Sequence, residues 1–259
     1  MANSSTRTAT PRAFLSLVAL TLAALTPSAQ AENSVGLGIG VVPEYEGSED
    51  YRALPIPLIN YENGNFFISP RAGLPSAGLK TELGNDWTAG VFLGMRMGRE
   101  SHRSSHLQGT DDIDFHGVAG LYTEWRPGPF SIGAAYYQAL HGGYGGTAEL
   151  RGTYLAWQGG NDTLRLGVST QWADSDSMKT NFGVKQHEAA ASRGRLRAYS
   201  PSSGFKSASA YGTWHHQLGG RWSMVTTLGV KSLLGDAEDS PIIQDKTSFF
   251  GNVGLMYSF

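Results

Sequence analysis

The residues best suited to chemistry lie within one polar stretch of the sequence. They are three histidines and three aspartates, namely His102, His106, Asp111, Asp112, Asp114 and His116. A hydrolase needs a nucleophile or an activated water beside a base that a third group orients. Histidines four residues apart share a metal ion only on a helix, and this stretch is predicted to be a solvated loop. Because neither G-x-S-x-G nor H-E-x-x-H occurs, we expect no catalytic residue, no metal site and no cofactor.

A second set of charged residues alternates with apolar residues along predicted strands. Successive side chains of a strand point to opposite faces, so these charges are expected on the inner face of a barrel. Such charges either line a water-filled pore or pair with one another in a filled lumen. We favour a narrow or occluded lumen, because the large residues Phe92, Tyr122 and Trp157 are also expected to face inward. The predicted lumen charges are Arg96, Glu124, Arg126, Glu149, Arg151, Arg165 and Lys231.

The alternation that positions these charges recurs in segments of about ten residues, the length of a tilted membrane-spanning strand. Between residues 247 and 259, Phe249, Val253, Leu255, Tyr257 and Phe259 share one face, and mostly small or polar residues share the other. The same pattern covers residues 87–98, 115–126, 163–172 and 221–233. Aromatic residues at the segment ends are typical of interfacial girdles, and they are Trp87, Phe115, Trp125, Trp157, Trp172 and Trp222.

The connections between these segments alternate in length. Short turn signals lie at residues 62–65, 84–86, 127–129, 159–162 and 218–221, and longer polar loops lie at 43–52, 99–114, 141–146, 173–204 and 234–246. Short periplasmic turns and long outer loops are typical of outer-membrane barrels, which have an even number of strands. We therefore divide residues 65–83 near 71–73 and predict an antiparallel transmembrane β-barrel of ten to twelve strands, with twelve favoured. A secreted β-sandwich would explain the alternation but not the combined pattern.

The first 31 residues have the features of a cleaved export signal. Arg7 and Arg12 precede an apolar run over residues 13–25, and Ala29 and Ala31 occupy the two positions that a signal peptidase reads. This run is too short to cross a hydrocarbon core of about 30 Å. We expect cleavage after Ala31, export to the outer membrane and one barrel domain over residues 32–259. Removal of the signal leaves 18 basic against 22 acidic residues, which argues against nucleic acid as a partner.

Three shorter patterns complete the picture. Leu255, Tyr257 and Phe259 stand at alternate positions at the end of the chain, and this ending resembles the signal that barrel-assembly machinery recognises. The glycine-rich residues 36–40 are expected to form a strand with glycines along one face rather than a phosphate-binding loop. The acidic loops 44–50 and 236–239 could bridge to lipopolysaccharide through divalent cations, although such charge is more often simply solvated.

Several motifs resemble the MipA/OmpV family, whose name refers to an MltA-interacting protein. They are residues 43–51 (PEYEGSEDY), 112–114 (DID), the glycine-rich 141–146, 172–174 (WAD), 182–184 (FGV) and 233–242 (LLGDAEDSPI). The resemblance covers essentially the whole chain after residue 31. It implies a non-enzymatic outer-membrane barrel that acts as a scaffold between a lytic transglycosylase and a penicillin-binding murein synthase.

Two other functions fit the same sequence pattern. A narrow channel for small solutes or drugs would use the inward charges for selectivity. A surface adhesin would expose the long loop over residues 173–204 to a host. Outer-membrane lipid, lipopolysaccharide and the barrel-assembly machinery are expected partners in all three cases.

Overall fold

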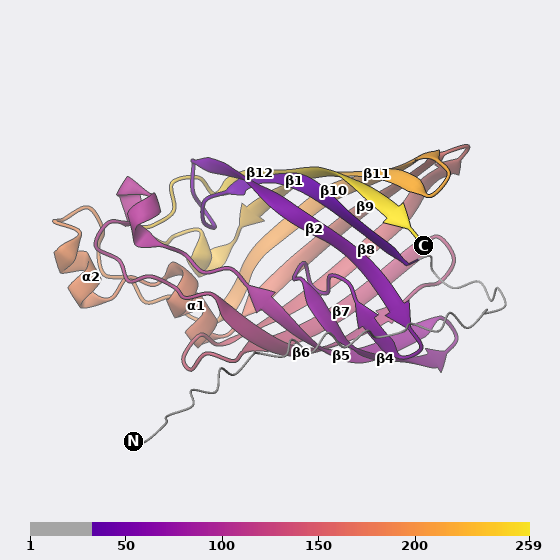
Figure 1. Ribbon diagram of the computed structural model, residues 1–259. Coiled ribbons are helices and arrows are strands. Elements are labelled where there is room, and N and C mark those ends of the chain that lie inside the picture. Colours follow the sequence, from indigo (N-terminus) through magenta and orange to yellow (C-terminus); the bar gives the residue numbers. More distant parts are fainter. Residues whose placement is uncertain (1–32) are drawn as a thin grey trace, which may run out of the picture. The chain divides into compact units, whose positions relative to one another are not determined.

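Residues 33–259 are described by a computed structural model, and they form a closed antiparallel β-barrel of twelve strands (Figure 1). Each strand pairs with the next along the chain, and β1 closes the barrel against β12 from Ser34↔Ser258 to Val41↔Gly251. The predicted fold is therefore confirmed, while the predicted export signal lies outside the described residues. The strands are β1 (Ser34–Pro43), β2 (Tyr51–Asn63), β3 (Phe66–Ile68), β4 (Ser76–Gly84), β5 (Trp87–Arg96), β6 (His116–Trp125), β7 (Phe130–Ala139), β8 (Gly146–Gly159), β9 (Asp162–Ala173), β10 (Gly204–Gly219), β11 (Trp222–Leu233) and β12 (Thr247–Ser258).

The predicted division of residues 65–83 is also confirmed. β3 ends at Ile68 and β4 begins at Ser76, with residues 69–75 between them. Pro70 and Pro75 lie in this connection, where the missing N–H and fixed φ of proline interrupt regular strand pairing. β3 is only 3 residues long, so this part of the wall is shorter than its neighbours.

Alternation of side chains explains why the chain forms a barrel wall. On β1, Leu37 and Ile39 point outward and are 65% and 62% exposed. The intervening Gly38 faces inward, where an added Cβ would lie 2.6 Å from the carbonyl oxygen of Val253 on β12. The prediction of a strand with glycines along one face is confirmed, because only glycine permits this close approach of the backbones.

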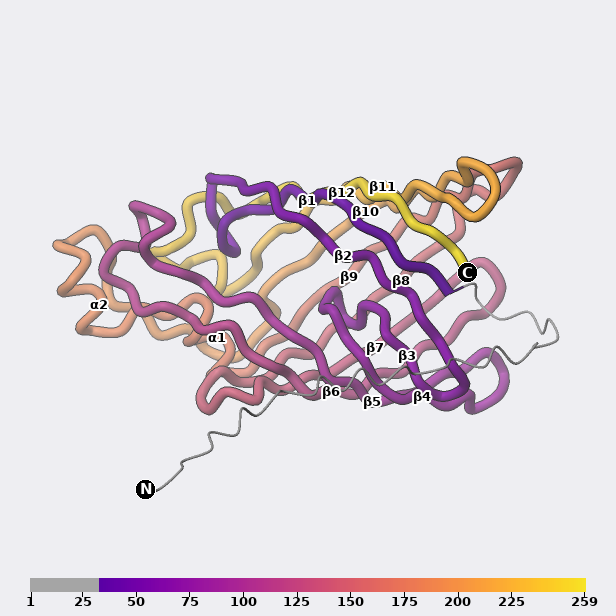
Figure 2. Tube along the Cα trace, viewed as in Figure 1, coloured from indigo at the N-terminus to yellow at the C-terminus, as the bar shows by residue number. Residues whose placement is uncertain are grey.

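The two ends of the barrel differ. The turn end carries the short connections 64–65, 85–86, 126–129, 160–161 and 220–221. The start of β1 and the end of β12 also lie there, where the Phe259 N–H donates to the Asn33 carbonyl over 2.9 Å. The loop end carries residues 44–50, 97–115, 140–145, 174–203 and 234–246. Figure 2 shows that these long loops lie together at one end of the barrel. The predicted alternation of short and long connections is confirmed.

The loop end contains regular structure that the sequence pattern did not reveal. The longest loop holds the helices α1 (Ser175–Phe182) and α2 (Gln186–Ala191), and three short 3₁₀ turns are η1 (Ser101–Arg103), η2 (Ser105–Leu107) and η3 (Gly235–Ala237). Among the described residues, no helix combines the length and apolar character needed to cross a membrane.

The aromatic residues at strand ends face outward, as girdle residues should. Trp87 and Trp125 stack with ring centroids 5.8 Å apart, and Trp222 contacts Tyr257 edge to face. Phe92 and Tyr122 face inward and are buried, as predicted. The inward prediction for Trp157 was wrong: this side chain is 62% exposed, because a bulge between Leu155 and Trp157 reverses the alternation on β8.

Candidate functional site

A buried ion-pair cluster lies on the inner wall at the loop end of the barrel. Glu46, from loop 44–50, contacts Lys206 Nζ over 3.1 Å and Lys231 Nζ over 2.9 Å. The Lys206 side chain is 1% exposed, and the Glu46 side chain is 26% exposed. Burial disfavours ionisation of Glu46, but the ammonium groups of Lys206 and Lys231 outweigh it and hold the pKa of this carboxyl well below its usual value. Loop 44–50 is thus fixed to the inner wall by charge.

This cluster corrects one sequence interpretation. Loop 44–50 is not simply a solvated acidic face, because Glu46 turns into the barrel. The acidic residues of 236–239 are also engaged: Asp236 accepts from the Ser202 N–H, and Lys246 pairs with Glu238 and Asp239. Lys206 was missed because a bulge between Phe205 and Ser207 interrupts the alternation at this residue.

The long loop packs on the same end of the barrel through α1. Met178 and Phe182 are completely buried and pack with Ala173, Leu233 and Ala237. The Asp174 side chain caps α1 by accepting the Ser177 N–H over 2.8 Å, which satisfies one of the free donors of the first turn. The apolar face of α1 therefore packs on the ends of β9 and β11 and on η3.

A second apolar cluster contains residues from four loops at the loop end. Tyr45, Leu107, Val184, Leu196 and Ile242 come from four different loops and are buried together. The Tyr45 hydroxyl donates to the Ile242 carbonyl over 3.0 Å, and burial raises its pKa to about 12. We call the loops 44–50, 97–115, 140–145, 174–203 and 234–246 together the cap. The cap is thus an ordered structure with its own core.

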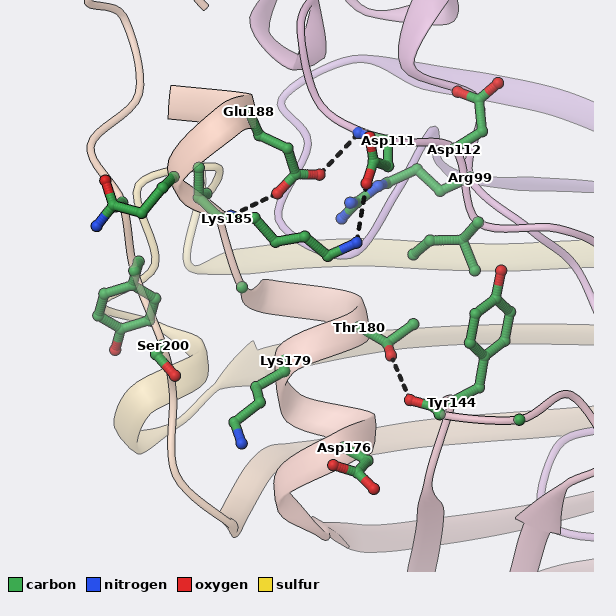
Figure 3. Close-up of a pocket in the computed structure, with 18 residues that line it drawn as sticks. Arg99, Asp111, Asp112, Tyr144, Asp176, Lys179, Thr180, Lys185, Glu188 and Ser200 are labelled. Carbon is green, nitrogen blue, oxygen red and sulfur yellow. Dashed lines mark hydrogen bonds and ion pairs between the residues drawn. The ribbon is translucent and has the colours of Figure 1, made fainter. Parts of the chain in front are cut away.

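A cleft in the cap lies among loops 97–115, 140–145 and 174–203 (Figure 3). Its volume is about 610 Å³. Asp111 contacts Lys185 Nζ over 2.8 Å, and hydrogen bonds from Lys185 and then His187 lower the pKa of this carboxyl. Glu188 accepts the N–H groups of Asp111 and Lys185. These bonds join α2 to loop 97–115.

The chemistry-bearing residues of the sequence are separated by this fold. His106 Nε2 lies 3.1 Å from the Pro241 carbonyl, and His116 Nδ1 lies 2.8 Å from the Asp114 carbonyl. Asp112 accepts the Ser101 N–H over 2.6 Å, whereas His102 lies beside Glu100. His106 therefore joins its loop to loop 234–246, whereas the other three contacts stay within residues 100–116. His102, Asp111, Asp112 and Asp114 are exposed, as expected for a solvated loop.

One acidic group has the spacing of metal ligands. Asp111, His187 and Glu188 each bring one ligand-type atom within 4.8 Å of the others. Both Glu188 oxygens already accept backbone N–H groups, and Asp111 pairs with Lys185. The contacts of Asp111 and Glu188 therefore hold α2 and loop 97–115 together.

The predicted lumen charges occupy varied positions. Glu149 pairs with Arg151 over 2.6 Å and also accepts from Gln171. Arg96 donates to Asn181 of α1 over 3.3 Å, and Lys231 belongs to the Glu46 cluster. Glu124 pairs with Arg126 over 2.6 Å. Arg126 lies in the turn that follows β6, and Arg165 on β9 is exposed. A role for these seven residues in a lumen or pore remains a prediction.

An aromatic cluster lies inside the wall below the cap. Phe67 packs edge to face on Tyr122 at 5.7 Å between centroids, and Phe92 lies 6.3 Å from the same ring. The Arg71 guanidinium lies over the Phe67 ring at 4.2 Å and over the Tyr122 ring at 4.8 Å. Such cation–π contacts position a charge against an otherwise apolar surface.

The turn end offers a different kind of surface. The hairpins β8–β9 and β10–β11 are joined there by Asp162, which accepts from Trp214 Nε1 over 2.8 Å and lies 2.7 Å from His216 Nδ1. The Gln217 N–H donates to the Asn161 carbonyl over 2.8 Å. β10 is 16 residues long, whereas about 9–11 residues suffice to cross a bilayer. These hairpins therefore extend beyond the hydrocarbon layer.

Comparison with protein families identifies the chain. The family model described as MltA-interacting protein MipA matches residues 35–259. The chain belongs to this family. The resemblance stated from the sequence motifs is thus confirmed, and with it the description of the chain as an outer-membrane β-barrel.

Curated relatives and solved structures extend this comparison. The MltA-interacting proteins of Escherichia coli (strain K12) and Shigella flexneri are each 26% identical over 236 residues, which is 89% of this chain and 92% of theirs. An outer membrane channel from Pseudomonas putida F1 matches at 11% identity and a TM-score of 0.43, covering 91% of this chain and 100% of that one. OmpT of Vibrio cholerae matches at 13% identity and a TM-score of 0.35 over 78% of this chain, which spans only 63% of that protein.

Proposed function

We propose that this protein is a non-enzymatic outer-membrane scaffold that binds a lytic transglycosylase and connects it to a penicillin-binding murein synthase. The observation that carries the proposal is family membership over residues 35–259, together with relatives named for interaction with MltA. The start of β1 and the end of β12 both lie at the turn end. This end faces the periplasm in the proposed orientation.

The binding surface we propose is the joined hairpin ends at residues 158–162 and 215–221. Short turns alone would present little area, but these hairpins are formed by long strands, because β8 has 14 residues and β10 has 16. The bonds from Trp214 and His216 to Asp162 fix both hairpins in one arrangement. A rigid surface binds with a smaller loss of conformational entropy than separate mobile turns.

The ordered loops favour a scaffold over a channel. Glu46, Lys206 and Lys231 fix loop 44–50 to the inner wall, and Met178 and Phe182 bury one face of α1. The ordered cap also offers less adaptable surface to a host receptor than a mobile loop would.

The test is affinity capture of the tagged protein from crosslinked native membranes, with partners identified by mass spectrometry and an unrelated barrel of similar abundance as the control. We expect specific recovery of a lytic transglycosylase and a murein synthase. The variant Leu218→Asp changes the exposed hairpin surface and should lower recovery at least fivefold. His187→Ala, an exposed change at the opposite end, should leave recovery unchanged.

Two results would contradict the proposal. Recovery that matches the control barrel would remove the scaffold function. Equal recovery of these enzymes with wild type and with Leu218→Asp would support the partners but contradict the hairpin ends as their binding surface. Correct assembly of each variant is checked by heat-modifiable migration on gels, so that a folding defect is not mistaken for a lost contact.

A further inference from the structure

The barrel wall has a long strand edge without a partner. β2 pairs with β1 from Ser34↔Asn60 to Pro43↔Tyr51, but it pairs with β3 only from Tyr61↔Ile68 to Asn63↔Phe66. Among the described residues, residues 51–60 make no backbone hydrogen bond on the side away from β1. Figure 2 shows the reason, because the β3–β4 connection turns back well short of the loop end that β2 reaches.

The unpaired edge is also poor in hydrogen-bond donors. The Glu62 N–H donates to the Asn33 side chain, at the start of β1, over 2.7 Å. Alternate residues of a strand direct their N–H groups to opposite sides, so odd-numbered residues of β2 direct theirs away from β1. Pro55 and Pro57 have no N–H at two of these positions. The edge is therefore protected against the addition of another strand.

Over residues 54–59, β2 is apolar on both faces. Pro55, Pro57 and Ile59 alternate outward, while Leu54, Ile56 and Leu58 face inward and are half-buried. The inward side chains lie against small residues, since an added Cβ on Gly254 would meet Leu58 Cδ1 at 2.5 Å. Leu54, Ile56 and Leu58 thus give the inner face of β2 a hydrocarbon surface.

Two arginines of these segments, Arg52 in β2 and Arg71 in connection 69–75, have a buried guanidinium nitrogen without a partner. The Arg71 Nε atom, in connection 69–75, is buried without a hydrogen-bond partner, although its Nη1 donates to the Ser69 hydroxyl and the Pro70 carbonyl. The Arg52 Nε atom is likewise buried and unpaired, at the outer part of β2. Buried unpaired donors are rare and costly, and guanidinium groups bind carboxylates through paired hydrogen bonds.

We propose that the unpaired edge of β2 borders a lateral opening that binds a long-chain fatty acid from the outer leaflet. The opening lies between residues 51–60 of β2, the connection 69–75 and the outer end of β5. Backbone groups at membrane depth remain unpaired only where protein or a cavity shields them from lipid. The acyl chain lies along Leu54, Ile56 and Leu58, and the carboxylate lies at Arg71. A single chain is favoured because Phe67, Phe92 and Tyr122 fill the adjoining lumen.

The test uses the full-length mature protein in vesicles of phosphatidylethanolamine and phosphatidylglycerol, with photoreactive palmitate as the probe. We expect crosslinks concentrated in residues 51–60 and 69–75, and competition by unlabelled palmitate. Arg71→Gln should lower this labelling at least fivefold, and Arg71→Lys should restore part of it. Arg126→Gln, an exposed arginine at the turn end, is the matched control and should leave the labelling unchanged.

A second pair of variants tests the apolar lining. Ile56→Asp places a charge on the inner face beside the unpaired edge and should lower labelling. Ser169→Asp places the same charge on the inner face of β9, which is paired on both sides, and should not. Uniform labelling of outward positions on all strands would overturn the proposal. So would labelling unaffected by Arg71→Gln, or labelling by a photoreactive diacyl phospholipid but not by palmitate.

Discussion

Removal of the Glu46 charge is expected to loosen the cap and destabilise the barrel. In wild type, one carboxylate faces two ammonium groups, and the Lys206 side chain is 1% exposed. Glu46→Gln leaves both lysine charges without their partner. Breaking a fully buried ion pair costs about 3–5 kcal/mol. Because Glu46 keeps 26% side-chain exposure, solvent screening reduces the expected loss to about 2–3 kcal/mol.

The assay is urea unfolding of the reconstituted protein followed by tryptophan fluorescence. Asp50→Asn removes an exposed charge from the same loop and is the matched control, with an expected change below about 0.5 kcal/mol. In the double variant Glu46→Gln/Lys206→Met, the loss should be smaller than the sum of the single losses by about 1 kcal/mol or more. If Glu46→Gln unfolds like Asp50→Asn, the cluster does not hold the loop and the reasoning fails.

The same carboxyl predicts a pH dependence. The pKa of Glu46 is depressed in the folded protein, so its stabilisation is fully present above the unfolded carboxyl value of about 4.3 and is lost as the pH falls through the folded value. Wild type should therefore lose stability more steeply than Glu46→Gln when the pH is lowered from about 5. Parallel pH profiles of the two proteins would contradict this assignment.

Four further expectations concern the cap, the wall and the two ends of the chain. Phe182→Ala empties a fully buried site and should cost about 3 kcal/mol of helix docking, detected as faster proteolysis within residues 174–203; an unchanged cleavage rate would show that α1 docks without it. Gly38→Val forces a side chain onto the β12 backbone and should abolish the heat-modifiable folded band, whereas Gly152→Ala, with only ordinary contact at 3.8 Å, should assemble normally. Deletion of Phe259 should reduce the assembled fraction in cells if Leu255, Tyr257 and Phe259 form the assembly signal, and an undiminished fraction argues against that role. Mass spectrometry of the outer-membrane protein should find Glu32 at the N-terminus, and a retained Ala29 would place the cleavage elsewhere.

The wall of this barrel could be predicted because its rule is local. Each membrane-spanning strand alternates outward apolar and inward small or polar residues, so Leu37, Gly38 and Ile39 indicate their faces without knowledge of any partner. Most strands followed from this alternation, and the division near residues 71–73 followed from the length of segment 65–83, its prolines and the even number of strands expected of a barrel. The family also followed from the sequence, because its motifs are contiguous.

Errors arose where the backbone departs from that local rule. The bulge at Leu155 and Trp157 turned a predicted inward side chain outward, and the bulge at Phe205 and Ser207 concealed Lys206. One inserted residue reverses every later side chain on a strand. The bulges themselves have no sequence signature in this chain.

The cap and the unpaired edge were decided by tertiary structure alone. Glu46 meets Lys206 and Lys231, residues far along the chain, only because closure of β1 on β12 brings loop 44–50 over β10 and β11. Pro55 and Pro57 are compatible with a strand edge, but the missing partner of β2 becomes visible only in the register with β3. Alternation determines which face a side chain takes, whereas the pairing of distant residues depends on how the closed sheet places its loops.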